Sequence, residues 1–253
     1  DYTIRNTDRS VGATLSGEIA NLYGNEGLED SPIRITLTGT CGQSFGVWNA
    51  GGVHMHLIGD ANDYVGKGMA GGKLVINPPR NIQYDPHQSA IMGNTCLYGA
   101  TGGKLFAAGR AGERFAVRNS GAIAVVEGIG DNGCEYMTGG IVAVLGSVGV
   151  NFGAGMTGGF AYLCDEDDDI QARINPELVE ALPIEQKGIL TEHLRGLINQ
   201  HYEETGSEHS LYLLTHFSEA ITKFRLVKPK TSDVKNLLGH ISRSSAELQL
   251  QAQ

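Results

Sequence analysis

Paired glycines that recur at a nearly fixed interval constrain this 253-residue chain more than any other feature. Each pair precedes a short apolar run, and a Gly-Ala pair takes the same place once. Their first members are Gly51, Gly71, Gly102, Gly121, Gly139 and Gly158. The successive steps are 20, 31, 19, 18 and 19 residues, so all but one lie near nineteen. A fixed period of this size is typical of repeat proteins, in which each repeat is a structural unit stacked on the next.

The apolar runs that follow the glycines have the composition of short strands. The runs at residues 53–58, 73–76 and 141–145 are rich in branched side chains and are bounded by glycine. A period near nineteen is too short for a strand–helix–strand crossover, which needs roughly 30 residues. We therefore predict a mainly β protein, a right-handed parallel β-helix of about six or seven coils across residues 30–165, with flanking C-terminal helices.

The glycine content agrees with this prediction. The chain holds 36 glycines, about twice the usual share of ~7%. The corners of a β-helix need residues with positive φ, or residues without a side chain where backbones approach closely. The one long step, between Gly72 and Gly102, contains Asn77-Pro78-Pro79-Arg80 and predicts a loop at residues 77–95 that leaves one coil; its role is open.

Both ends of the chain differ from the repeat. Residues 15–24 fit either a short helix or a first coil, and we favour the coil. Residues 175–183 predict a short helix that Asn175 caps, and apolar spacing predicts longer helices at 189–202 and 211–224. The predicted organisation is a glycine-repeat β-helix domain at 1–165 with an irregular start at 1–30, a helical extension packed on it at 166–230, and a partly disordered tail at 231–253.

Composition limits the classes of partner. The chain has 19 Lys and Arg against 28 Asp and Glu, a net charge of −9, which argues against nucleic acid and anionic membranes. There is no apolar run long enough to span a membrane and no signal peptide. The missing initial Met suggests a fragment or a processed chain. The four cysteines lack metal-ligand spacing, so we expect buried thiols in a cytoplasmic protein.

Three segments match the G-x-G-x-x-G pattern of dinucleotide-binding loops, at residues 66–71, 128–133 and 153–158. Such a loop must open a helix, because the helix N-terminus binds the pyrophosphate. The first and third segments instead run into another glycine and a predicted strand. Glycine corners explain them without a ligand.

Two further patterns give only weak evidence of a metal site. His54 and His56 alternate along one predicted strand and face one side, but no third metal ligand is evident. The acidic run at 165–169 lacks the spacing of a calcium loop, so a solvated turn or a patch facing a basic partner is the simpler interpretation. We therefore predict no catalytic, cofactor-binding or metal-binding residue in this chain.

Several segments together closely resemble one family. They are residues 6–12, 15–20, 42–46, 94–103, 116–121 and 153–159. They resemble the C-terminal glycine-repeat (GXGXG) domain of the glutamate synthase large (alpha) chain, of the bacterial NADPH-dependent type, and the likeness runs from about Ile4 to Pro229.

The resemblance implies a right-handed β-helix without catalytic residues of its own. In that family the large chain also carries a glutamine amidotransferase domain and a barrel that binds FMN and an iron–sulfur cluster, while a small subunit with FAD supplies electrons from NADPH. The C-terminal domain braces the other domains of an oxidoreductase that makes L-glutamate from glutamine and 2-oxoglutarate. None of the family's functional residues can be carried over to a position of this chain.

Two other function classes stay open. A β-helical scaffold subunit of the formylmethanofuran dehydrogenase type shares the glycine pattern, although it would not need residues 6–12 or the helical extension. A β-helix enzyme acting on polysaccharide would need carboxylates and a basic residue on adjacent coils, where this repeat has apolar residues and glycine.

Overall fold

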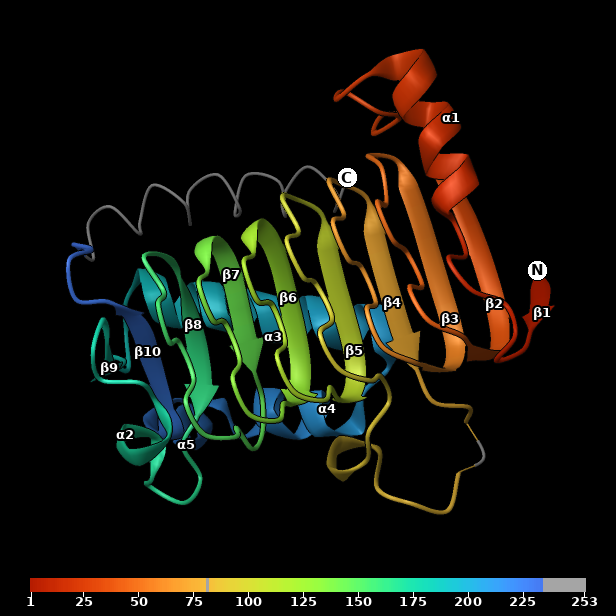
Figure 1. The fold of residues 1–253 in the computed structure, drawn as a ribbon. Helices are drawn as coiled ribbons and strands as arrows, with labels where there is room; N and C mark the ends of the chain where they lie inside the picture. The colour runs from red at the N-terminus through yellow and green to blue at the C-terminus, as the bar shows by residue number, and fades with distance from the viewer. Residues whose placement is uncertain (81, 234–253) are drawn as a thin grey trace.

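A computed structural model of the chain describes residues 1–80 and 82–233, and its centre is one sheet of ten strands (Figure 1). The spatial order is β1-β2-β3-β4-β5-β6-β7-β8-β10-β9. The strands are β1 (Tyr2–Ile4), β2 (Ile33–Cys41), β3 (Val53–Ala61), β4 (Lys73–Asn77), β5 (Lys104–Arg110), β6 (Ser120–Gly128), β7 (Thr138–Val144), β8 (Gly158–Cys164), β9 (Val179–Pro183) and β10 (Phe224–Pro229).

Strands β1 to β8 pair in parallel and in sequence order, which is the pattern of a chain that coils. Like positions stack from coil to coil: Leu74 pairs with Leu105, and Leu105 with Ala124. The prediction of a parallel β-solenoid is confirmed, with about seven turns. β10 pairs antiparallel with β8, and β9 antiparallel with β10, so the C-terminal end of the sheet departs from the repeat.

From β4 to β8 the sheet is buried on both faces, which is why these strands read as nearly continuous apolar runs. β2 and β3 alternate instead, because their outer-facing residues stay partly exposed. On β4, Leu74 and Ile76 point into the solenoid and belong to its interior core, whereas Val75 points to the other side. A second core forms on that outer side, where Phe106, Tyr162 and their neighbours meet the helices.

The wall opposite the sheet is built from five-residue segments, which we call arches. They are residues 44–48, 64–68, 95–99, 114–118, 132–136 and 151–155. In every arch the first, third and fifth residues have positive φ, between 54° and 73°, whether or not they are glycine. The arches start 20, 31, 19, 18 and 19 residues apart, so they follow the period of the glycine pairs.

Hydrogen bonds between coils explain this backbone. In the arch of residues 132–136, Asn132 and Tyr136 donate their backbone N–H groups to the following coil, whereas Cys134 donates to the preceding coil, at distances of 2.7 to 2.9 Å. The N–H groups of the three residues with positive φ thus point alternately to the following and the preceding coil, and each finds a carbonyl there.

Helices cover the outer face of the sheet. α3 (Ile189–Thr205) crosses β4, β5 and β6, and α4 (Glu208–Thr215) packs beside it, as Figure 1 shows behind the sheet. The predicted helix at 189–202 is confirmed. The predicted helix at 211–224 is instead divided into α4, α5 (Phe217–Ala220) and a 3-10 turn, η2 (Ile221–Lys223), before β10.

Two expectations at the ends of the solenoid are wrong. Residues 15–24 are no first coil, because α1 (Ala13–Tyr23) is a helix. Residues 175–183 are no helix either: a short helix lies earlier, α2 (Ile170–Arg173), and β9 is extended because its backbone pairs with β10.

The long glycine step is a loop, as expected. It leaves the solenoid after β4, contains the 3-10 helix η1 (Pro86–Gln88), and returns before β5 (Figure 1). The predicted tail at 231–253 lies outside the described residues from 234 onward. Within residues 1–80 and 82–233, every helix is too short or too polar to cross a lipid bilayer.

Candidate functional site

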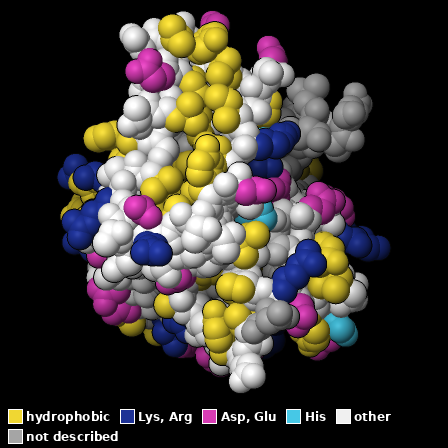
Figure 2. Space-filling model, turned by 90° about the vertical axis from the view of Figure 1, so that its right-hand side faces the viewer, with side chains coloured by type: hydrophobic (Ala, Val, Ile, Leu, Met, Phe, Trp, Pro, Cys, Tyr) yellow, Lys and Arg dark blue, Asp and Glu magenta, His cyan; other side chains and the backbone are white. Residues whose placement is uncertain are grey.

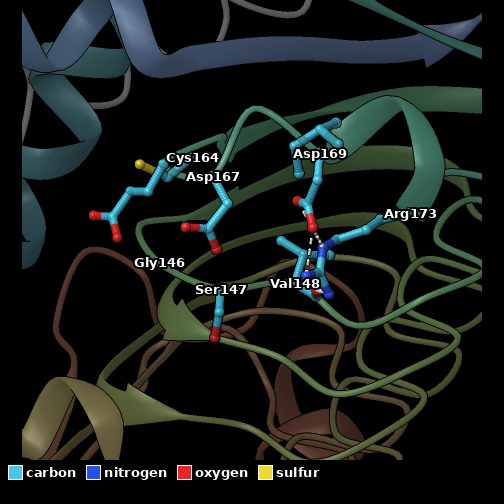
Figure 3. A pocket seen from close by; sticks show the side chains of 9 residues that line it. Gly146, Ser147, Val148, Cys164, Asp167, Asp169 and Arg173 are labelled. Carbon is cyan, nitrogen blue, oxygen red and sulfur yellow. Dashed lines mark hydrogen bonds and ion pairs between the residues drawn. The ribbon is translucent and has the colours of Figure 1, made fainter.

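A small pocket lies where the last coil meets α2 (Figure 3). Its lining residues are Gly146, Ser147, Val148, Cys164, Glu166, Asp167, Asp169, Ile170 and Arg173. Its volume is about 30 Å³, which is the space of a water molecule and far below that of a metabolite pocket. Arg173 lies at one side of it and binds Asp169 at 2.6 Å and the Val148 carbonyl at 2.8 Å (Figure 3).

The acidic run at 165–169 forms the rim of this pocket and has its own cations. Arg225 on β10 lies 3.3 Å from Asp165 and 3.5 Å from Asp168, and Lys223 lies 3.5 Å from Asp168. Asp165 is buried and also accepts a hydrogen bond from the backbone of Ile170. Asp165 and Asp168 of this run are therefore paired with basic residues of the same chain.

The three G-x-G-x-x-G segments are parts of the repeat. Gly66 and Gly68, like Gly153 and Gly155, are the third and fifth residues of two arches. The segment at 128–133 ends β6 and leads into the next arch. None of the three opens a helix, so none has the geometry that holds a pyrophosphate.

His54 and His56 lie on the outer face of β3, as their spacing indicates. Burial, together with the nearby Lys73 and Arg34, holds the pKa of His54 below its usual value. His56 bonds to the Asn77 side chain. Among the described residues no group of three or more His, Cys, Asp or Glu could hold a metal ion.

The structure brings together one polar cluster that no sequence motif indicates: Glu127 on β6, His201 on α3 and Ser207 at the start of α4. His201 Nε2 lies 3.1 Å from Glu127 Oε1, and the Ser207 hydroxyl donates to the same oxygen. The residue types are those of a nucleophilic triad, but the connectivity differs, because serine and histidine both bind the carboxylate. Glu127 and His201 are 1% and 0% exposed, so no substrate reaches them.

Two other buried or stacked pairs join distant segments. Tyr162 Oη on β8 lies 3.0 Å from His193 Nδ1 on α3, and burial lowers the pKa of His193 to about 4. In the long loop, His87 stacks on His209 of α4 with ring centroids 4.3 Å apart. Partners separated by 31 and 122 residues leave no local signal in the sequence.

The thiols do not fit an iron–sulfur cluster, whose ligands are thiolates. Burial raises the pKa of Cys41, Cys96 and Cys164 to about 12 and raises that of Cys134 as well. All four are free and buried, and Cys164 belongs to the outer core, whereas the other three belong to the interior core.

Comparison with known proteins shows the family to which the chain belongs. Residues 1–230 match the GXGXG motif family. The chain is 52% identical over 243 residues to ferredoxin-dependent glutamate synthase 2 of Synechocystis sp., 50% over 229 residues to the glutamate synthase [NADPH] large chain of Azospirillum brasilense, and 52% over 227 residues to glutamate synthase [NADH] of Schizosaccharomyces pombe. These alignments cover 95%, 90% and 90% of this chain but only 15%, 15% and 11% of the relatives. The chain therefore belongs to the GXGXG motif family, as the counterpart of one segment of the glutamate synthases.

Proposed function

We propose that this chain is a non-catalytic structural domain of a glutamate synthase, and that it braces the amidotransferase and FMN-binding domains of that enzyme. One observation carries the proposal. Nearly the whole chain aligns with about a seventh of a glutamate synthase, and most of the polar clusters among its described residues are either buried from solvent or already paired with one another. A rigid rod with regular faces suits a brace, because each coil is fixed by hydrogen bonds to both neighbours.

The reaction of the whole enzyme is part of the same proposal. L-glutamate would form from glutamine and 2-oxoglutarate, with FMN and an iron–sulfur cluster held by the rest of the large chain. NADPH is the proposed donor, with a small FAD-containing subunit delivering its electrons. The relatives named for ferredoxin, NADPH and NADH are about equally similar, so identity alone does not select the donor. We also propose that the enzyme is cytoplasmic.

Two measurements on the 253-residue chain test the proposal. Calorimetry with FMN, NADPH and zinc should give no binding at micromolar concentrations, and no glutamate should be released from glutamine. The chain should instead be retained by the A. brasilense large chain from which the matching segment has been deleted. Micromolar cofactor binding that Gly153→Val or Gly155→Val abolishes would contradict the proposal, as would failure to associate.

A further inference from the structure

Four side chains that carry or can carry a positive charge form one row across the outer face of the sheet, and we call them the basic row. In the register of the parallel strands, Arg34 on β2 pairs with His54 on β3, and His54 pairs with Lys73 on β4. Lys73 in turn pairs with Lys104 on β5. Neighbouring strands lie about 4.8 Å apart, so these side chains stand side by side. Like charges at this spacing repel one another, and a row of them favours anions beside it.

The carboxylates of the described residues balance only part of the basic row. Glu204, at the C-terminal end of α3, forms an ion pair with Lys73. Glu29 is the other carboxylate whose charge acts on His54. Arg34 is exposed, and within residues 1–80 and 82–233 no carboxylate lies at ion-pair distance from it. The guanidinium of Arg34 is therefore the least compensated charge of the row.

The imidazole of His54 lies between two cations of the row and responds to both. Burial lowers its pKa most, followed by Lys73 and then Arg34, and each of these cations acts on the ring more strongly than Glu29 or Glu204. The electrostatic potential that these four charges produce at the ring is therefore positive. An anion bound here would favour the protonated imidazole, so His54 is a built-in reporter of such binding.

The part of the row on β2 and β3 is open to solvent. α3 packs against β4, β5 and β6, where it covers the buried Lys104. On β2 and β3 the outward residues next to the row, Thr36 and His56, are only partly buried. Figure 2 views the end of the molecule at which β1 and β2 lie, and it shows Lys, Arg, Asp and Glu side chains gathered around a histidine. A small ligand can therefore reach Arg34 and His54.

We propose that Arg34, His54 and Thr36, with Lys73 beside them, form a binding site for a small oxyanion, namely a phosphate or carboxylate group. A guanidinium donates two parallel hydrogen bonds to either group, and the Thr36 hydroxyl and the protonated His54 ring add further donors. Lys73 adds positive charge while it stays paired with Glu204. A nucleic acid fits less well, because the whole chain has a net charge of −9.

NMR of the histidine rings tests the site in the 253-residue chain. Inorganic phosphate, added at an ionic strength kept constant with sodium chloride, should shift the His54 ring resonances with saturation at a Kd of about 1 mM. The pKa of His54 should rise toward its ordinary value, because the bound anion stabilises the imidazolium. The exposed ring of His216 on α4 is the internal control and should not shift. Succinate in place of phosphate distinguishes the two sources: tighter binding of phosphate assigns a phosphate group, and tighter binding of succinate assigns a carboxylate.

Two matched variants separate a site from general charge screening. Arg34→Gln should weaken the binding of the better anion by at least about tenfold, because it removes the bidentate donor. Lys187→Gln removes an exposed cation just before α3, at the opposite end of that helix, and should leave binding unchanged. Both side chains are exposed, so both variants should keep the melting temperature of the parent chain. Shifts that do not saturate, or equal affinities in the two variants, would overturn the proposal.

The same site should be present in the whole enzyme. In a full-length A. brasilense large chain in which this chain replaces the matching segment, equilibrium dialysis with the labelled anion should count one site fewer after Arg34→Gln. Equal counts would show that another part of the large chain occupies the site, and would overturn the proposal. Neither result bears on whether the chain braces the enzyme, so this inference and the proposed function are tested separately.

Discussion

Glycine acts in two ways at each corner of the solenoid. The first glycine of a pair is needed for close approach: a Cβ on Gly139 would lie 2.2 Å from the Ser120 carbonyl oxygen of the preceding coil. The second is needed for its conformation, since Gly140 has φ +85°. Ala122 takes this second place once, and its φ is not positive.

Gly140→Val should therefore be among the most damaging single changes. Its Cβ would meet the Ala122 carbonyl oxygen at 2.4 Å, and valine rarely adopts positive φ. We expect a loss of at least about 2 kcal/mol of unfolding free energy, measured by denaturant titration. Gly17→Ala is the matched control, because nothing lies near its Cβ position, and should stabilise the chain by about 0.5–1 kcal/mol. Equal melting temperatures for both variants would contradict the assigned role.

Protonation of His193 should destabilise the fold in acid. Burial lowers its folded pKa to about 4 from 6.5, so the unfolded chain binds more protons between these values and stability falls as the pH drops through that window. Between pH 7 and 5 the loss should be about 2 kcal/mol. In His193→Gln the dependence of unfolding free energy on pH should be flatter by this amount. Identical slopes in the two proteins would show that His193 does not titrate on unfolding.

At the scale of elements, polar contacts fasten the helices to the sheet. Glu127 holds both α3 and α4, through His201 and Ser207. His209 bonds the Leu145 carbonyl at 2.9 Å and also stacks on the loop residue His87. The helical layer and the long loop are thus tied to the solenoid at several points.

Glu127→Ala should loosen this layer. It leaves His201 and Ser207 buried without their shared acceptor, and a buried donor left without a partner costs about 1–3 kcal/mol. Exchange of the α3 and α4 amides should accelerate more than exchange in β2 and β3. Glu204→Ala breaks the half-exposed pair with Lys73 and should cost no more than about 1 kcal/mol. Comparable losses of unfolding free energy in both variants would show that the burial of Glu127 adds nothing to the strength of its contacts.

The sequence predicts the elements of the repeat well, because period and glycine spacing record every coil. It does not predict the arches, where bulky residues such as Trp48, Arg118 and Tyr136 take positive φ. Local preference opposes that conformation, and hydrogen bonds between coils impose it. The helix prediction for residues 175–183 is wrong for a similar reason. A capped segment bounded by prolines suggests a helix, but β10, some 45 residues later, pairs with this segment as a strand.

The candidate clusters were beyond sequence reasoning for a different reason. Glu127 and His201 stand 74 residues apart, and His87 and His209 stand 122 apart, so only the packing of α3 and α4 on the sheet joins them. That no residue of this chain serves catalysis stays a prediction, which the cofactor and glutamine measurements address.

At the scale of the whole molecule, strands and helices of the same chain close the C-terminal end of the solenoid. β8 is followed by β10 and β9, and the outer face of β8 buries Phe160 and Tyr162 beneath α3. Without these elements the last coil would expose a strand edge and a row of aromatic side chains, and such ends associate.

A chain that ends at Asp165 should therefore self-associate. It keeps all the coils but loses the antiparallel strands and the helices, so the edge of β8 and the outer core, including Val75, Phe106 and Phe160, lose their cover. Light scattering should show oligomers or aggregate at concentrations where the full chain is monomeric, and thermal unfolding should lose its single sharp transition. Because the interior core of the coils is intact in the truncated chain, a monomer that melts cooperatively near the temperature of the full chain would mean that the coils suffice. The helices would then serve contacts with other parts of the enzyme instead of closing the solenoid.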